Sequence, residues 1–113
     1  MAGIAQLTDL TFGDVVFKTA TPVLVEFWAP WSKACRLAGP DLEAAAAAFG
    51  VDARPMRLNV EENPVAATVY GVRHIPTCIL FRAGEELDQW AGALDRDEII
   101  RRVRAACSGD GAR

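Results

Sequence analysis

A serine and a cysteine stand at the spacing where two cysteines would make a redox-active dithiol. The stretch is Ser32-Lys33-Ala34-Cys35, and Trp31 precedes it. In a C-x-x-C pair one thiolate attacks a disulfide and the second thiol resolves the mixed disulfide. A serine hydroxyl at neutral pH is not ionised and forms no mixed disulfide. Only the Cys35 half of such chemistry is therefore available in this segment.

Two opposing influences act on Cys35. It is expected in the first turn of a helix, where backbone donors and the positive end of the helix dipole favour a thiolate, with Lys33 and Arg36 nearby in sequence. Burial beneath the helix start would instead favour the neutral thiol. Both a thiol that forms mixed disulfides and an inert packed thiol remain open. Ser32 is a favourable helix cap, and its hydroxyl is expected to form a hydrogen bond with Cys35 across the first turn.

The remaining cysteines and the single histidine add weaker candidates. Three cysteines with no C-x-x-C pair fit neither a disulfide scaffold nor a zinc site, so no metal or organic cofactor is predicted. Cys78 is either a free buried thiol or an alternative redox partner of Cys35. Cys107 is expected to pack on the apolar side of the last helix. His74 either favours a thiolate at Cys35 or is simply solvated.

The elements that must position these residues alternate strands with helices. The order predicts an α/β fold with a mixed sheet flanked by helices, in a single domain over 1–113 with a loose tail at 107–113. Pro40 is expected to kink its helix. The predicted elements are a short helix from near Thr8 or Thr11, a strand within 22–30, a helix over 32–49, a strand over 53–60, a helix over 63–71 capped by Asn63, a hairpin over 77–92 turning at Ala83 and Gly84, and a helix over 95–107.

Glu26 interrupts an otherwise apolar run bounded by Pro22 and Pro30. Such a run is typical of a strand buried on both faces of a sheet. Removing a carboxylate from water raises its pKa unless a cation compensates. Arg57, on the neighbouring predicted strand, is the expected partner.

Length and charge exclude several classes of protein. The chain has 113 residues, 51% hydrophobic and 24% charged, which is ordinary for one globular domain. A net charge of −3 gives no basic field for nucleic acid. The opening MAGIAQLTDL lacks the features of a secretory signal, and no apolar run approaches membrane-spanning length. A soluble, cytoplasmic monomer is expected.

An ordered series of motifs resembles the thioredoxin family over roughly Leu7 to Cys107. The motifs are VLVEFWAPW, Pro40 in the long helix, LNVEENP, YGVRHIPT, and the Ala91-Gly92 pair. The resemblance implies the thioredoxin fold, a central mixed sheet with helices on both sides. It also implies a redox site at the start of the kinked helix, with a cis Ile75–Pro76 bond in a loop against that site.

When the family pattern is carried over position by position, the resemblance implies that this sequence differs from it at the residues of the redox site. Ser32 occupies the place of the attacking cysteine, and Cys35 that of the resolving cysteine. Lys33 and Ala34 replace the usual glycine and proline. Glu26 stands where the family has a buried aspartate, so it either assists proton transfer to and from Cys35 or forms a buried ion pair without chemistry.

The resemblance also implies a surface that docks an extended segment of a protein partner. Lys33 and His74 make this surface more polar and more basic than is usual in the family. Its residues are Trp31, Lys33, Ala34, His74, Ile75, Pro76, Ala91 and Gly92.

The function predicted is monothiol exchange through Cys35 with protein partners that carry thiols or disulfides. An external thiol such as glutathione would finish each turnover, and autonomous dithiol reductase activity is not expected. One alternative is a redox-inactive binding module that uses Trp31 and the Ile75–Pro76 loop. Another is an active enzyme blocked by an engineered Ser32, although Lys33 and Ala34 also depart from the family pattern and favour natural divergence.

Overall fold

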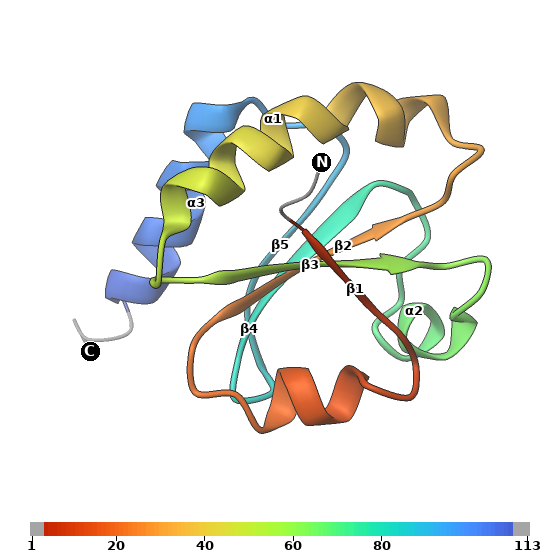
Figure 1. The fold of residues 1–113 in the computed structure, drawn as a ribbon, viewed down its shortest axis with the longest axis horizontal. Coiled ribbons are helices and arrows are strands. Elements are labelled where there is room, and N and C mark those ends of the chain that lie inside the picture. The colour runs from red at the N-terminus through yellow and green to blue at the C-terminus, as the bar shows by residue number, and fades with distance from the viewer. Residues whose placement is uncertain (1–3, 110–113) are drawn as a thin grey trace.

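The computed structural model describes residues 4–109, which form one five-stranded sheet covered by helices (Figure 1). The elements are β1 (Ala5–Leu7), a π-helix η1 (Gly13–Phe17), β2 (Val23–Trp28), α1 (Lys33–Phe49), β3 (Arg54–Asn59), α2 (Pro64–Val69), β4 (Thr77–Arg82), β5 (Glu85–Ala91) and α3 (Arg96–Gly109).

The sheet has the strand order β1-β3-β2-β4-β5, with β2 at its centre. Strand β2 pairs parallel with β3 and antiparallel with β4, and β1 pairs parallel with β3. Every residue of β2 from Val23 to Phe27 is buried, as the near-continuous apolar run predicts. The predicted α/β fold with a mixed sheet is therefore confirmed.

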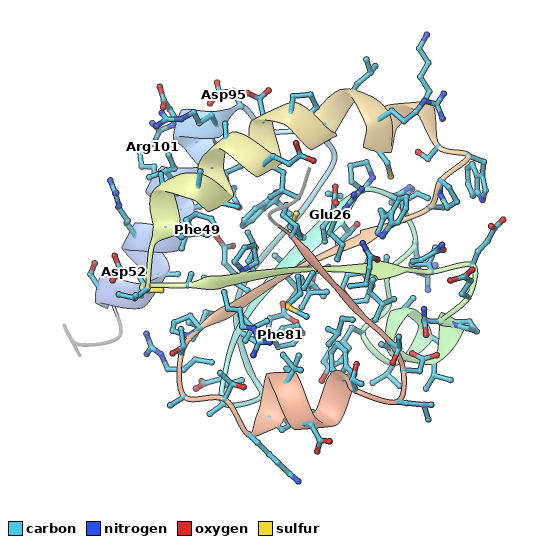
Figure 2. The ribbon with its side chains drawn as sticks, viewed as in Figure 1. Glu26, Phe49, Asp52, Phe81, Asp95 and Arg101 are labelled. Carbon is cyan, nitrogen blue, oxygen red and sulfur yellow. The ribbon has the colours of Figure 1, made fainter. Side chains whose placement is uncertain are left out.

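Successive residues of the strands point to opposite faces of the sheet, so each face has its own apolar core. Helices α1 and α3 lie together on one face, while η1, the unlabelled helix at the bottom of Figure 1, lies across the other. Figure 2 shows Phe49 on the side of α1 and Phe81 toward η1. The α1–α3 face includes Leu24, Leu42, Cys78, Leu80, Trp90 and Ile99, and the opposite face includes Leu7, Val16, Val25, Phe27, Leu58 and Phe81.

The N-terminal segment differs from the sequence prediction. Strand β1 was not predicted, because it has three residues and only Leu7 is buried. The first helix begins at Gly13, two residues after the predicted start at Thr11, but its N-cap is Phe12 and neither threonine caps it. Those two threonines instead bind each other: the Thr8 N–H donates to Thr11 Oγ1 at 3.0 Å, and the Thr11 N–H donates to Thr8 Oγ1 at 3.2 Å.

The start of α2 is capped by a residue from far away in the sequence. Asn63 occupies the N-cap position as predicted but makes no side-chain cap hydrogen bond. The Asp9 carboxylate accepts hydrogen bonds from the Val65 and Ala66 N–H groups at 3.0 and 2.9 Å. The Asn63 Oδ1 atom accepts from the Asp9 N–H at 3.0 Å, which holds the two segments together.

The C-terminal half follows the sequence prediction more closely. The β4–β5 hairpin turns at Ala83 and Gly84, whose φ values of 50° and 87° fit a tight turn that needs positive φ at both positions. Cys107 packs against the apolar core of α1 and α3, as expected. Helix α3 continues to Gly109, so residues 107–109 are helical where a loose tail was expected, and 110–113 lie outside the described residues.

We expect Asp9→Ala to lower the free energy of unfolding by about 1 to 2 kcal/mol, because two backbone donors of α2 lose their acceptor. Urea denaturation measures this change. Asp14→Ala is the matched control, since Asp14 forms only an exposed ion pair with Lys18 and should cost less than about 0.5 kcal/mol. Equal losses in the two variants would contradict the role of Asp9 as the α2 cap.

Candidate functional site

The junction between β2 and α1 places Ser32 and Cys35 at one edge of the sheet. The Ser32 N–H donates to the Ala29 carbonyl at 3.2 Å, which turns the chain into the helix. Ser32 is the N-cap of α1, and its Oγ accepts a hydrogen bond from the Cys35 N–H at 3.2 Å, as predicted. Ser32 is buried, and only 1% of Cys35 is exposed. The thiol of the motif therefore lies beneath the first turn of α1.

The loop before β4 reaches the same edge of the sheet. The Ile75–Pro76 peptide bond is cis, and Thr77 pairs with Phe27 at the end of β2. The Pro76 carbonyl accepts a hydrogen bond from the Gly92 N–H at 2.7 Å, which ties this loop to the end of β5. Three segments distant in sequence thus meet around the start of α1.

Most residues of the predicted docking surface are exposed. Trp31 is 62% exposed although it is a large apolar side chain. Ile75 is half-buried and Pro76 is buried, so the loop contributes mainly its backbone. The exposed members are Trp31, Lys33, Ala34, His74, Ala91 and Gly92.

Glu26 is buried in the centre of the sheet and forms an ion pair with Arg57. The Arg57 Nε atom donates to Glu26 Oε1 at 2.8 Å across the parallel β2–β3 pairing, as predicted. Figure 2 shows Glu26 in the interior of the molecule. Burial raises the pKa of the Glu26 carboxyl above its ordinary value, and the charge and hydrogen bond of Arg57 offset this only in part. The carboxyl therefore holds its proton more readily than an exposed glutamate does.

Cys78 lies opposite Glu26 in the β2–β4 pairing and faces α1 and α3 with it. Burial raises the pKa of the Cys78 thiol strongly, and the nearby Glu26 and Cys35 raise it further. Cys78 is thus held as a neutral thiol. Cys35 and Cys78 are both free in the structure, and their use as a redox pair stays a prediction.

A small cavity lies between the sheet and α1 beside these groups. Its volume is about 10 Å³, which is room for about one water molecule. Its lining includes Glu26, Ala38, Pro76, Cys78 and Trp90. The Glu26 carboxyl therefore borders a space large enough for about one water molecule.

Trp28 belongs to the site, although the sequence analysis did not single it out. The Arg57 guanidinium lies 4.1 Å from the centroid of the Trp28 ring, a cation–π contact. The Trp28 Nε1 atom is buried without a hydrogen-bond partner. The alternation of β2 and β3 side chains was the available signal, because it places Trp28 and Arg57 on the same face of the sheet.

Two other classes of site are not found in the part of the chain that the structure describes. Among residues 4–109 there is no group of three or more side chains able to hold a metal ion. Over the same residues no helix is long and apolar enough to cross a membrane.

Comparison with known proteins gives one consistent family. Residues 3–105 match the thioredoxin family. Thioredoxin 1 of Nostoc sp. is 38% identical over 99 residues, which cover 88% of this chain and 92% of that protein. Thioredoxin of Porphyra purpurea is 36% identical over 85% of this chain and 90% of that protein. The chloroplastic M-type thioredoxin of Chlamydomonas reinhardtii is 36% identical over 90% of this chain and 73% of that protein.

Because the pKa of Glu26 is raised on folding, we expect it to make stability depend on pH. The native state binds the Glu26 proton more tightly than the unfolded state. This contribution to stability is therefore complete below the unfolded pKa and is lost as pH rises through the folded pKa. The free energy of unfolding of the parent, relative to Glu26→Gln, should fall as pH rises, by at most about 1.4 kcal/mol per pH unit.

Urea denaturation of both proteins between about pH 5 and pH 8 tests this slope. Glu62→Gln is the control, since Glu62 is exposed, does not contribute to the raised pKa of Glu26, and its removal should leave the slope close to that of the parent. A difference between the parent and Glu26→Gln that is constant with pH, or that grows as pH rises, would show that the carboxyl is not destabilised by burial.

Proposed function

This chain belongs to the thioredoxin family, and from that premise we propose that it exchanges thiols and disulfides with protein partners through Cys35 alone. In this proposal it lacks the dithiol reductase cycle, because Ser32 stands in the place of the attacking thiol.

The hydrogen bond between the Cys35 N–H and Ser32 Oγ is the observation that carries this proposal. At 3.2 Å the Ser32 oxygen acts as a helix cap. Ser32 is also buried, which removes it further from a partner disulfide. The hydroxyl of Ser32 therefore supports a structural role for this residue. Cys35 is then the one thiol that the segment Ser32 to Cys35 offers for exchange.

A single thiol can form a mixed disulfide with a partner, but it completes a catalytic turnover only with help from a second, external thiol. The Cys35 thiolate attacks one sulfur of a partner disulfide, and the other partner sulfur leaves and takes up a proton. A glutathione thiolate then attacks the partner sulfur of the mixed disulfide, so Cys35 leaves as a thiolate. A second glutathione reduces the partner and forms glutathione disulfide. The partner gains two electrons, and two glutathione molecules supply them.

We propose that Glu26 holds the proton that Cys35 releases when it becomes a thiolate. A carboxyl with a raised pKa gives up and takes back a proton nearer to neutral pH than an exposed glutamate does. The cavity beside Glu26 has room for about one water molecule next to the carboxyl, although Cys35 does not line it.

We place the reaction in the cytoplasm, where the glutathione pool keeps single thiols reduced.

One observation favours a second function, a redox-inactive module that only binds its partner. Cys35 is 1% exposed while Trp31 is 62% exposed. The surface thus offers a large apolar contact above a thiol that is out of reach. In this alternative Trp31 and the Ile75–Pro76 loop dock the partner, and Cys35 is only a packing residue.

We expect Ser32→Cys to reduce a protein disulfide, with dithiothreitol as electron donor, at least about tenfold faster than the parent, because it restores an attacking thiol with Cys35 as its resolver. Turbidity of an insulin solution follows the reduction. The double variant Ser32→Cys/Cys35→Ser is the matched control, since it has the attacker without the resolver and should stay near the parent rate. Equal and substantial rates in the parent and Ser32→Cys would overturn the proposal.

Glutathione disulfide should leave one glutathione on Cys35, because the Cys35 thiolate expels the other glutathione as its thiol. Peptide mass spectrometry of the native protein locates the adduct. Cys107→Ala should keep the adduct on Cys35, and Cys35→Ala should lose it. If only Cys107 reacts, the binding module is the better description.

A further inference from the structure

The cations of this chain fall into two groups. Ion pairs neutralise many of them, namely Lys18 with Asp14, Arg57 with Glu26, Arg96 with Asp97, Arg101 with Glu98, and Arg102 with Asp88 and Glu98. Among the described residues no ion pair is found for Lys33, Arg36, Arg54, Arg73 or Arg104. Arg54 and Arg104 lie away from the start of α1, whereas Lys33, Arg36 and Arg73 lie near it. All three side chains are exposed.

These three cations lie at the edge of the sheet that carries the thiol. Lys33 and Arg36 belong to the first turn of α1. The Arg36 Nη1 atom donates to the Pro30 carbonyl at 3.2 Å, so this guanidinium lies against the turn that carries Trp31. Arg73 precedes His74 in the loop that leads to Pro76 and β4. Because β4 pairs with β2, this loop and the start of α1 meet at one edge.

Exposed apolar surface coincides with these cations. Trp31 is 62% and Leu37 is 68% exposed, and each is within two residues of an unpaired cation in sequence. A large aromatic side chain beside cations is the composition typical of a protein-binding surface. No backbone hydrogen bond is described for Ile75, which lies in the same loop, so its N–H and carbonyl remain available to an extended segment.

Negative charge lies on the opposite side of the end of β2. Glu61 and Glu62 are exposed in the loop that follows β3. Since the strand order is β3-β2-β4, this acidic loop and the basic loop before β4 are separated by β2. The edge is therefore divided into a positive side, toward α1 and β4, and a negative side, toward β3.

We propose that this edge docks an extended segment of a partner protein whose side chains next to the docked residue are acidic and face the α1 and β4 side. The proposal rests on the protein-docking role proposed above and names the chemical class of the partner. A chain of net charge −3 repels acidic proteins at long range. At physiological salt the screening length is about 8 Å, so the nearby cations Lys33, Arg36 and Arg73 govern the interaction at contact. Nucleic acid is disfavoured because Glu61 and Glu62 would lie against its backbone.

Fluorescence anisotropy with short labelled peptides of one length tests the charge preference. The peptides have the same extended core, with serine in place of any cysteine, flanked by aspartate, serine or lysine. Because they lack a thiol, binding is measured independently of any reaction at Cys35. A single-stranded oligonucleotide with the net charge of the acidic peptide is included. We expect the acidic peptide to bind about tenfold more tightly than the lysine peptide at low salt, and this ratio to shrink at about 0.5 M salt.

Two double variants assign the preference to this edge. Arg36→Glu/Arg73→Glu should reverse it. Arg54→Glu/Arg104→Glu changes the net charge equally and should keep it, because Arg54 lies at the far end of β3 and Arg104 lines a pocket with Ala48, about 22 Å along α1 from Lys33. If the first double variant does not fold, Arg36→Gln/Arg73→Gln should abolish the preference.

Three results would overturn this inference: equal binding of all peptides or none, a preference that survives Arg36→Glu/Arg73→Glu, or tighter binding of the oligonucleotide. Equal binding together with a glutathione adduct on Cys35 would leave the thiol function standing. A clear preference for the acidic peptide without any Cys35 adduct would support this inference and favour the binding module over thiol exchange.

Discussion

Burial of the Glu26 carboxylate in the central strand is the constraint on which the rest of the site depends. A charge there is tolerated only with a compensating partner, and Arg57 is that partner, 2.8 Å away. The same guanidinium lies 4.1 Å from the centroid of the Trp28 ring, at the end of β2. Because a planar guanidinium can donate to a carboxylate and stack on an indole at once, a lysine would not serve equally at position 57. The ion pair therefore also fixes the strand end from which the chain turns into α1.

In the segment after β2, folding and redox chemistry require different properties of residue 32. A helix start needs an acceptor for its free N–H groups, and Ser32 Oγ supplies one to Cys35. A hydroxyl is as good a cap as the fold requires, whereas disulfide exchange requires a thiolate. In the function we propose, an oxygen stands in the place of a sulfur at residue 32, and the Ser32 cap is compatible with the sheet, α1 and the loop before β4 as they are built here. The match to the thioredoxin family over residues 3–105 covers all of these elements.

How much could be predicted from the sequence depended on how local each interaction is. The buried run of β2, the Ser32 cap and the β4–β5 turn follow from neighbouring residues, and the structure agrees. The Glu26–Arg57 pair was predictable because two adjacent strands carry one opposite charge each. Strand β1 was missed because two of its three residues are exposed, so no alternation marks it. Asn63 occupies the N-cap of α2 as predicted, but the carboxylate that accepts from the Val65 N–H was missed, because Asp9 is 56 residues away from Val65 and no local sequence pattern indicates that contact.

Access to Cys35 links the docking surface to the chemistry. The thiol is 1% exposed beneath a turn whose outer residues include the exposed Trp31 and Lys33. For the proposed exchange, a partner sulfur would reach Cys35 only in a state in which this turn has opened, and local opening of a helix end costs free energy. A partner shifts that equilibrium only by binding the open state more tightly than the closed one. In the function we propose, contacts of a partner with Trp31 and with the cations around it would therefore govern how often Cys35 is exposed. Selectivity among partners and reactivity of the thiol would then arise from the same surface.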